Sequence, residues 1–212
     1  MDTNLILSLI ANILLLAIQT WALCGIRNKR YIFKYYTYLQ NFISILVSTF
    51  FVIAVAADCM NVSRLLTAAK GFRYVATCGL VVTMFVFTFL SITCREDKNR
   101  IGSSDCKPGY SYRLVNIVLH YISPVLAVIS FLWFEKPIVL TDSLWTAIVA
   151  LPSVLYWTVY LILSVTNKWD EPYSFSVSKS KAVNDIAQVA FVLLFAVLFV
   201  FTTILLCTSQ QK

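Results

Sequence analysis

The chain has 212 residues, of which 59% are hydrophobic and 13% are charged. Soluble domains run near half apolar, so this composition excludes an ordinary soluble domain and indicates a protein whose solvent is the lipid bilayer. The net charge of +7 does not indicate a nucleic-acid partner, because the Lys and Arg residues flank apolar segments, where they set topology and meet anionic headgroups.

Six stretches of the chain contain no Asp, Glu, Lys or Arg, and in chain order they are 24, 23, 21, 21, 25 and 26 residues long. A helix needs about 20 apolar residues to cross ~30 Å of hydrocarbon, so every stretch qualifies as a span. We predict an all-α, polytopic membrane protein whose single domain is one compact bundle of six transmembrane helices. The domain covers residues 1–212, and the spans are expected at about 4–25, 35–57, 73–94, 113–134, 143–166 and 184–208.

Positive charge is distributed unequally between the two sides of this arrangement. The first, third and fifth loops hold twelve Lys and Arg residues, whereas the segments on the opposite side hold five. By the positive-inside rule, the odd-numbered loops face the cytoplasm and both termini face outside. We expect a multi-pass protein of the cell membrane in a bacterium, or of an endomembrane or the plasma membrane in a eukaryote.

The second span begins with the polar-rich segment FKYYTYLQN. Thr37, Asn41, Ser44 and Ser48 recur at the spacing of one helix face, and Gln40 lies close to that face. Unpaired polar groups are costly in hydrocarbon, so these side chains are expected to face the bundle. There they either link helices or line a cavity.

The fourth span carries His120, the only histidine in the chain. Asn116, His120 and Ser123 follow the spacing of one helix face, and Pro124 can loosen the backbone next to them. A histidine at this place is either a general base that works near neutral pH or a structural residue hydrogen-bonded across helices. Its position alone favours neither interpretation.

Thr37 and His120 approach the same leaflet, because both of their spans start from loops on one side of the membrane. Measured from the flanking charges, Thr37 lies about 5 Å and His120 about 10 Å along its helix, and snorkelling of Lys34 brings the two depths closer. A hydroxyl and an imidazole at matched depth are the minimum for nucleophilic acyl transfer. From the residues alone, interhelical packing is favoured over catalysis.

Several segments nevertheless resemble one family, the androgen-induced protein and androgen-dependent TFPI-regulating protein family, and especially its bacterial six-helix relatives. The similar stretches are KYYTYLQNFISILV, FRYVATCGLVVTMFVFTFL, VLHYISPVL, WTAIVALPSVLYWTVYLI and WDEPYSF, in which Glu171 replaces a tyrosine typical of the relatives. The animal members are intramembrane threonine hydrolases that cleave fatty acid esters of hydroxy fatty acids. Their nucleophilic threonine and essential histidine correspond to Thr37 and His120.

The resemblance implies a lipid-ester hydrolase that acts on such esters or on similar long-chain esters. Thr37 and His120 are then the catalytic residues, with no metal or other cofactor. Supporting roles near the histidine or the oxyanion are predicted for Asn41, Asn116, Gln40 and Ser123. A substrate carboxylate or headgroup is predicted to meet Lys34 or Arg73.

Two other functions are compatible with the same pattern. A small transporter or channel is one alternative, although no charge-free stretch holds the ionisable residues that usually couple transport. A non-catalytic lipid-binding scaffold is the other. Membrane lipids are expected partners in every case, nucleic acid is not, and the sequence leaves the oligomeric state open.

Overall fold

The structure is a computed structural model that describes residues 2–59, 63–93, 106–135, 148–149, 151–166, 168 and 180–209. Within these ranges the regular elements are all helices, and β-type pairing is limited to an isolated antiparallel bridge between Ile26 and Cys106. The segment WDEPYSF lies outside the described residues. The predicted all-α membrane bundle is confirmed.

Five helical stretches are long and apolar enough to cross a membrane: Thr3–Gly25, Tyr36–Asp58, Leu65–Phe89, Tyr112–Glu135 and Lys181–Leu198. They belong to α1 (Thr3–Gly25), α3 (Tyr36–Asp58), α4 (Ser63–Thr93), the run from α5 to η4, and α9 (Lys181–Ser209). The run comprises α5 (Tyr112–Ile117), the π-helix η3 (Val118–Ile122), α6 (Ser123–Ile129) and the π-helix η4 (Ser130–Glu135). A short α2 (Tyr31–Lys34) precedes α3.

The fifth and the third predicted spans compare with the structure as follows. The fifth contains α8 (Leu151–Val165), which has 15 residues, and residues 143–147 and 150 of that predicted span lie outside the described residues. The third is part of α4, which begins at Ser63 and has 31 residues, so Arg73 lies inside this helix instead of at its start.

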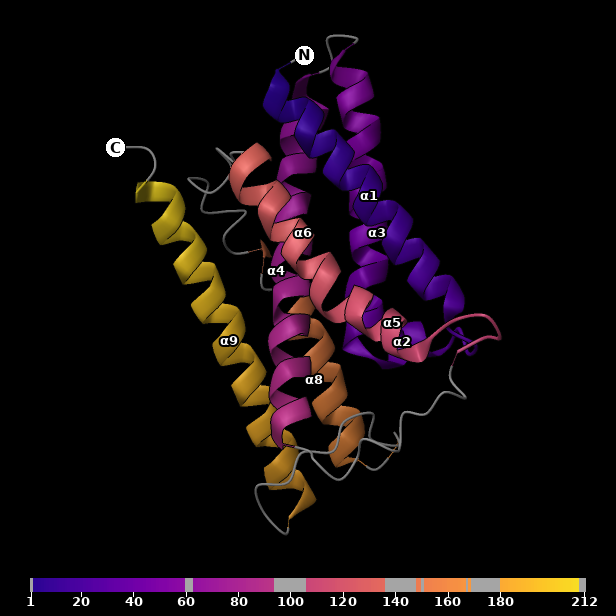
Figure 1. The fold of residues 1–212 in the computed structure, drawn as a ribbon. Coiled ribbons are helices and arrows are strands. Elements are labelled where there is room, and N and C mark those ends of the chain that lie inside the picture. Colours follow the sequence, from indigo (N-terminus) through magenta and orange to yellow (C-terminus); the bar gives the residue numbers. More distant parts are fainter. Residues whose placement is uncertain are drawn as a thin grey trace.

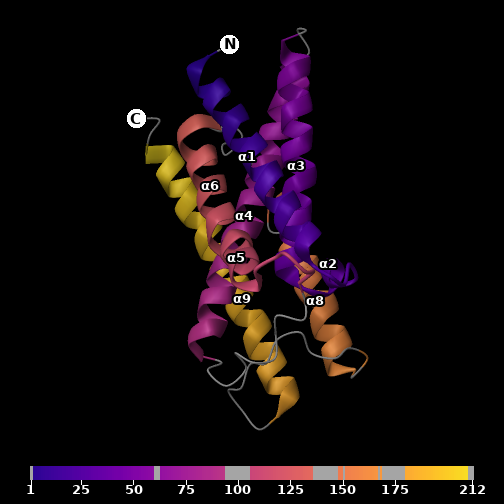
Figure 2. The ribbon, with the colours of Figure 1, turned by 45° about the vertical axis from the view of Figure 1, so that its right-hand side comes forward.

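The helices alternate in direction, and the N- and C-termini lie at the same end of the bundle (Figure 1). We call this the terminal end. α4 runs through the middle and packs against α3, α6 and α9, while α1 packs against α3 and η4. α8 starts beside the beginning of α3 and runs towards the end opposite the termini (Figure 2). There the Tyr36 hydroxyl lies 2.6 Å from the Ser153 hydroxyl, and the Tyr156 hydroxyl donates to the Lys34 carbonyl at 2.7 Å.

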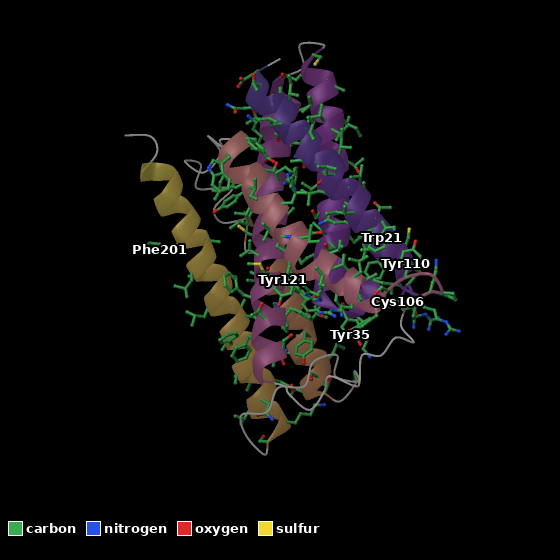
Figure 3. The ribbon with its side chains drawn as sticks, viewed as in Figure 1. Trp21, Tyr35, Cys106, Tyr110, Tyr121 and Phe201 are labelled. Carbon is green, nitrogen blue, oxygen red and sulfur yellow. The ribbon has the colours of Figure 1, made fainter. Side chains whose placement is uncertain are left out.

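Side chains are distributed as a membrane requires, with polar groups inside and apolar groups outside. On α1, Ser8, Asn12 and Gln19 are completely buried, whereas Ile10 and Leu14 are about half exposed. Phe201 on α9 points away from the bundle (Figure 3). Because lipid tails accept apolar side chains, the helices are free to turn their few polar residues towards one another.

The segment before α5 is attached to the end of α1. The Lys107 N–H donates to the Gly25 carbonyl at 2.8 Å, and the rings of Trp21 and Tyr110 lie 5.4 Å apart (Figure 3). A Cβ atom at residue 25 would collide with the Tyr110 ring, so only glycine permits this contact. The attachment fixes where α5 begins and therefore where η3 enters the bundle.

Lys29 closes the same end of α1 by donating to the carbonyl oxygen of Leu23 at 2.7 Å. Partial burial, followed by the nearby positive charge of Lys107, lowers the pKa of Lys29 below its ordinary value of 10.5. A lysine near the last turn is well placed to satisfy the open carbonyls of a helix end.

Candidate functional site

Asn41 is the residue that joins three helices at the centre of the predicted site. Its side chain is completely buried, and its Nδ2 donates to the Thr37 carbonyl at 2.9 Å and to the Leu119 carbonyl at 3.2 Å. Its Oδ1 accepts from Gln19 Nε2 at 3.1 Å. Asn41 therefore holds the first turn of α3 against η3 and α1.

The π-helix explains why the Leu119 carbonyl is free to accept this bond. In η3 the Ser123 N–H donates to the Val118 carbonyl, five residues back. The next donor in that register would be residue 124, which is a proline and has no N–H. Leu119 thus loses its helical partner, and the amide of Asn41 replaces it.

His120 follows Leu119 directly and is 7% exposed. Its ring stacks on Phe87, with the centroids 3.7 Å apart and the planes 19° from parallel. The backbone of Thr83 lies beside the ring, and Nδ1 has no hydrogen-bond partner among the described residues. In the neutral imidazole with its proton on Nε2, this open Nδ1 carries a lone pair.

Thr37 lies in the first turn of α3 and is also 7% exposed. Its hydroxyl makes no hydrogen bond to another described residue, so the structure contains no direct bond between the Thr37 hydroxyl and the His120 ring. The two residues are instead connected through Asn41, which binds the carbonyls of Thr37 and Leu119. The N-cap residue Tyr35 makes no side-chain cap hydrogen bond at the start of α3.

The predicted stripe on the second span is confirmed, because Thr37, Asn41, Ser44 and Ser48 are all buried. Gln40 is buried too, and its Oε1 occupies the space that a Cβ at Gly79 of α4 would need. The Gln40 Nε2 has no hydrogen-bond partner in the described part of the chain.

The remaining predicted residues lie at different distances from this centre. Ser123 is completely buried one turn after His120, and its hydroxyl has no partner among the described residues. Asn116 is half-buried on α5 and makes no side-chain hydrogen bond to another described residue. Lys34 is half-buried at the end of α2, where its carbonyl accepts from the Tyr156 hydroxyl.

Arg73 lies in a second buried cluster nearer the terminal end. Its Nε is 3.2 Å from Oε1 of Glu135, and both side chains have no exposed surface. The same oxygen accepts from the Ser130 hydroxyl at 2.9 Å and from Asn12 Nδ2 at 3.3 Å. Asn12 also donates to the Ser8 carbonyl at 2.9 Å.

This ion pair corrects one expectation from the sequence. The charge-free stretches begin after Arg73 and end before Glu135, which placed both residues at span ends and left no Asp, Glu, Lys or Arg in the interior of the spans. In the structure the two charges lie inside the bundle and face each other, and Arg73 is well within α4. The apolar residues on both sides of Arg73 were the signal that α4 continues through it.

Comparisons with family models, with curated proteins and with solved structures found no match to this chain. Among the described residues, no group of three or more His, Cys, Asp or Glu side chains is placed to hold a metal ion. The fold and the two clusters define a class, a multi-pass helical membrane bundle with a polar interior.

Proposed function

We propose that this protein is an intramembrane lipid-ester hydrolase in which Thr37 is the nucleophile and His120 the general base. The observation that carries the proposal is the pair of hydrogen bonds from Asn41 to the carbonyls of Thr37 and Leu119. They hold the hydroxyl-bearing turn beside the residue that precedes His120. In an apo arrangement catalytic hydrogen bonds are often long and tighten only around the substrate.

The reaction follows from the open Nδ1 of His120. Nδ1 takes the proton of the Thr37 hydroxyl while Oγ1 bonds to the ester carbonyl carbon. The tetrahedral intermediate collapses, the carbon–oxygen bond to the alcohol breaks, and the imidazolium returns the proton to the leaving alkoxide. Water, deprotonated by the same nitrogen, then attacks the acyl-threonine, releasing the fatty acid and restoring the Thr37 hydroxyl.

Two groups of donors are candidates for stabilising the oxyanion, namely the Asn41 amide and the N–H groups at the start of α3. Both Asn41 amide protons have carbonyl acceptors within hydrogen-bonding distance, so Asn41 acts by positioning the helices. The first turn of α3, whose N-cap residue Tyr35 makes no side-chain cap bond, carries the positive end of the helix dipole. We therefore assign oxyanion stabilisation to the first turn of α3.

The substrate we propose is a fatty acid ester of a hydroxy fatty acid or a similar long-chain ester, which enters the site from the surrounding membrane lipids. Lys34 is the residue assigned to a carboxylate or headgroup, because its half-buried side chain lies next to the start of α3. The guanidinium of Arg73 contacts Glu135 instead. From the charge of the loops we place both termini outside the membrane.

The test uses purified protein in detergent, a long-chain ester and a fluorophosphonate probe that labels active hydrolase nucleophiles. Thr37→Ala and His120→Ala are each expected to lose at least ~100-fold in turnover, together with probe labelling, because nucleophile and base act as a unit. Thr49→Ala is the matched control. Thr49 is a lipid-facing threonine of the same helix whose hydroxyl bonds the Ile45 carbonyl at 2.8 Å.

Unchanged turnover in a folded Thr37→Ala protein would eliminate Thr37 as the nucleophile. Absence of turnover and labelling in the wild-type protein, across a panel of long-chain esters, would favour the non-catalytic scaffold.

A further inference from the structure

The two buried clusters are separated by a thin apolar layer. One, the Arg73 cluster, consists of Ser8, Asn12, Arg73, Ser130 and Glu135. The other, the Thr37 cluster, consists of Gln19, Thr37, Gln40, Asn41 and His120. Leu15, Leu80 and Ala127, all with no exposed surface, pack together and form the apolar layer.

The same order of polar, apolar and polar residues occurs on two helical segments. Along α1, Leu15 lies between Asn12 and Gln19, and along the α5–η4 run, Ala127 lies between His120 and Ser130. Asn12 and Gln19 are seven residues apart, which is about 10 Å along a helix. The layer therefore occupies little more than the thickness of one side chain.

Each cluster contains buried polar atoms that lack a partner in the described part of the chain. In the Arg73 cluster these are Arg73 Nη1 and Nη2, Glu135 Oε2 and Asn12 Oδ1. In the Thr37 cluster they are His120 Nδ1, Gln19 Oε1 and Gln40 Nε2. Such atoms are costly when dry and gain hydrogen bonds when water enters, so hydration of either cluster is favourable.

Buried hydroxyls continue from the clusters towards the layer. Ser44 and Ser48 follow Asn41 on α3, Thr77 follows Arg73 on α4, and Ser123 follows His120. None of these hydroxyls has a hydrogen-bond partner among the described residues. Hydroxyls can both donate and accept, so they suit a transient chain of water molecules.

We propose that the interior of the bundle is a gated proton pathway, in which Glu135 and His120 exchange protons across the apolar layer. Ionisable residues inside membrane spans mark proton relays by default, and apolar constrictions gate by excluding water. A proton needs only a transient water chain, whereas a larger ion needs ligands and space.

The transfer conserves its atoms. Glu135 Oε2 accepts a proton from water at the terminal end and becomes a neutral carboxylic acid. When water bridges the apolar layer, the acid passes its proton to that chain, which delivers a proton to His120 Nδ1. The imidazolium releases a proton to water at the opposite end, so one proton has crossed and both residues are restored.

The surroundings of the two titrating groups differ in charge. Glu135 faces the Arg73 guanidinium from α4, the Asn12 amide from α1 and the Ser130 hydroxyl from its own helix. The groups that contact the His120 ring are neutral, namely the Phe87 ring and the Thr83 backbone, both from α4. Protonating Glu135 leaves Arg73 without its counter-charge. This state is unfavourable, so transfer of the proton from Glu135 towards His120 is favoured.

The test reconstitutes the full chain in liposomes that contain a pH-sensitive dye, with a potassium gradient and valinomycin to drive proton flux. Wild-type protein is expected to carry flux above protein-free liposomes, and Leu80→Ser to raise it about tenfold by wetting the layer. Leu46→Ser is the control, since Leu46 is 54% exposed on α3. Fluxes of wild type and Leu80→Ser that both equal the protein-free value would overturn the proposal.

A second variant tests whether Glu135 carries the proton. Glu135→Gln alone leaves a buried Arg73 unpaired, so the double variant Arg73→Gln/Glu135→Gln is used, with its folding checked by thermal unfolding. Flux is expected to fall to the protein-free value. Wild-type flux in the folded double variant would contradict the proposal, and because no ester is present, the result is independent of hydrolysis.

Discussion

The Arg73 cluster and the Thr37 cluster share α1 and the α5–η4 run, but different interactions hold them together. In the Arg73 cluster one carboxylate oxygen, Glu135 Oε1, lies within hydrogen-bonding distance of three donors, one of them a guanidinium. In the Thr37 cluster Asn41 makes three hydrogen bonds, and all of their partners are neutral amide or carbonyl groups. The Arg73 cluster is therefore stabilised by the attraction of opposite charges, and the Thr37 cluster by neutral hydrogen bonds of defined direction.

The difference indicates how a small membrane protein can combine stability with chemistry. Two opposite charges in hydrocarbon must stay together, because either one alone is very costly. Neutral amides impose no such demand, so they can position a hydroxyl and an imidazole while leaving the reactive atoms free. Stability is therefore expected to depend most on the Arg73 cluster, and activity on the Thr37 cluster.

The largest expected effect comes from breaking the ion pair. Arg73→Met or Glu135→Leu leaves one buried charge unpaired and should lower the free energy of unfolding by about 3–5 kcal/mol. The double variant removes both charges and should recover most of that loss. Denaturation in mixed micelles measures all three, and single variants as stable as the wild type would contradict this role.

Asn41→Leu should be the next most damaging change. It leaves the carbonyl of Leu119 and the amide of Gln19 without their partner, at about 2–3 kcal/mol, and it frees α3 to move away from η3. Ester turnover should fall further than in other variants of equal stability. Parallel measurements of unfolding and turnover, with Thr49→Ala as control, test whether Asn41 acts by positioning.

Asn12 and Gln19 offer the most direct comparison, because both lie on the buried face of α1. Asn12→Leu loses a bond to a carboxylate, at about 2 kcal/mol, whereas Gln19→Leu loses a neutral amide bond, at about 1 kcal/mol. Unfolding of the two variants under one condition gives the order. A greater loss of unfolding free energy for Gln19→Leu would mean that the bond to the Glu135 carboxylate contributes less to stability than the neutral amide bond.

Gly79→Ala should have the smallest net effect on stability. The new methyl group would collide with the Gln40 side chain, but alanine is the better helix former, so the loss should be about 1 kcal/mol. Because Gln40 belongs to the Thr37 cluster, we expect turnover to change more than unfolding. If unfolding changed more than turnover, Gln40 would have no role in the catalytic site.

The sequence predicted the membrane class and most helices well, because length and lack of charge are local properties. The first span was expected at 4–25 and is observed at Thr3–Gly25. The same rule failed at Arg73, since a charge was taken as the end of a span, and a partner more than sixty residues away permits it inside.

In the candidate site too, local features could be predicted from the sequence and contacts between helices could not. The spacing of Thr37, Asn41, Ser44 and Ser48 predicted one buried face, and burial confirms it. The roles of Thr37 and His120 stay predictions. That Asn41 reaches the Leu119 carbonyl depends on a π-helix and on Pro124, and no periodicity reveals that combination.

The sequence by itself determined that this chain belongs in a membrane, roughly where most of its helices lie, and that the polar face from Thr37 to Ser48 turns inward. These follow from the cost of exposing charge or backbone to hydrocarbon. Only the tertiary structure decided that the polar residues divide into two clusters with an apolar layer between them. That division depends on how α1, α3, α4 and the α5–η4 run are rotated and shifted against one another, and contacts between distant residues fix it.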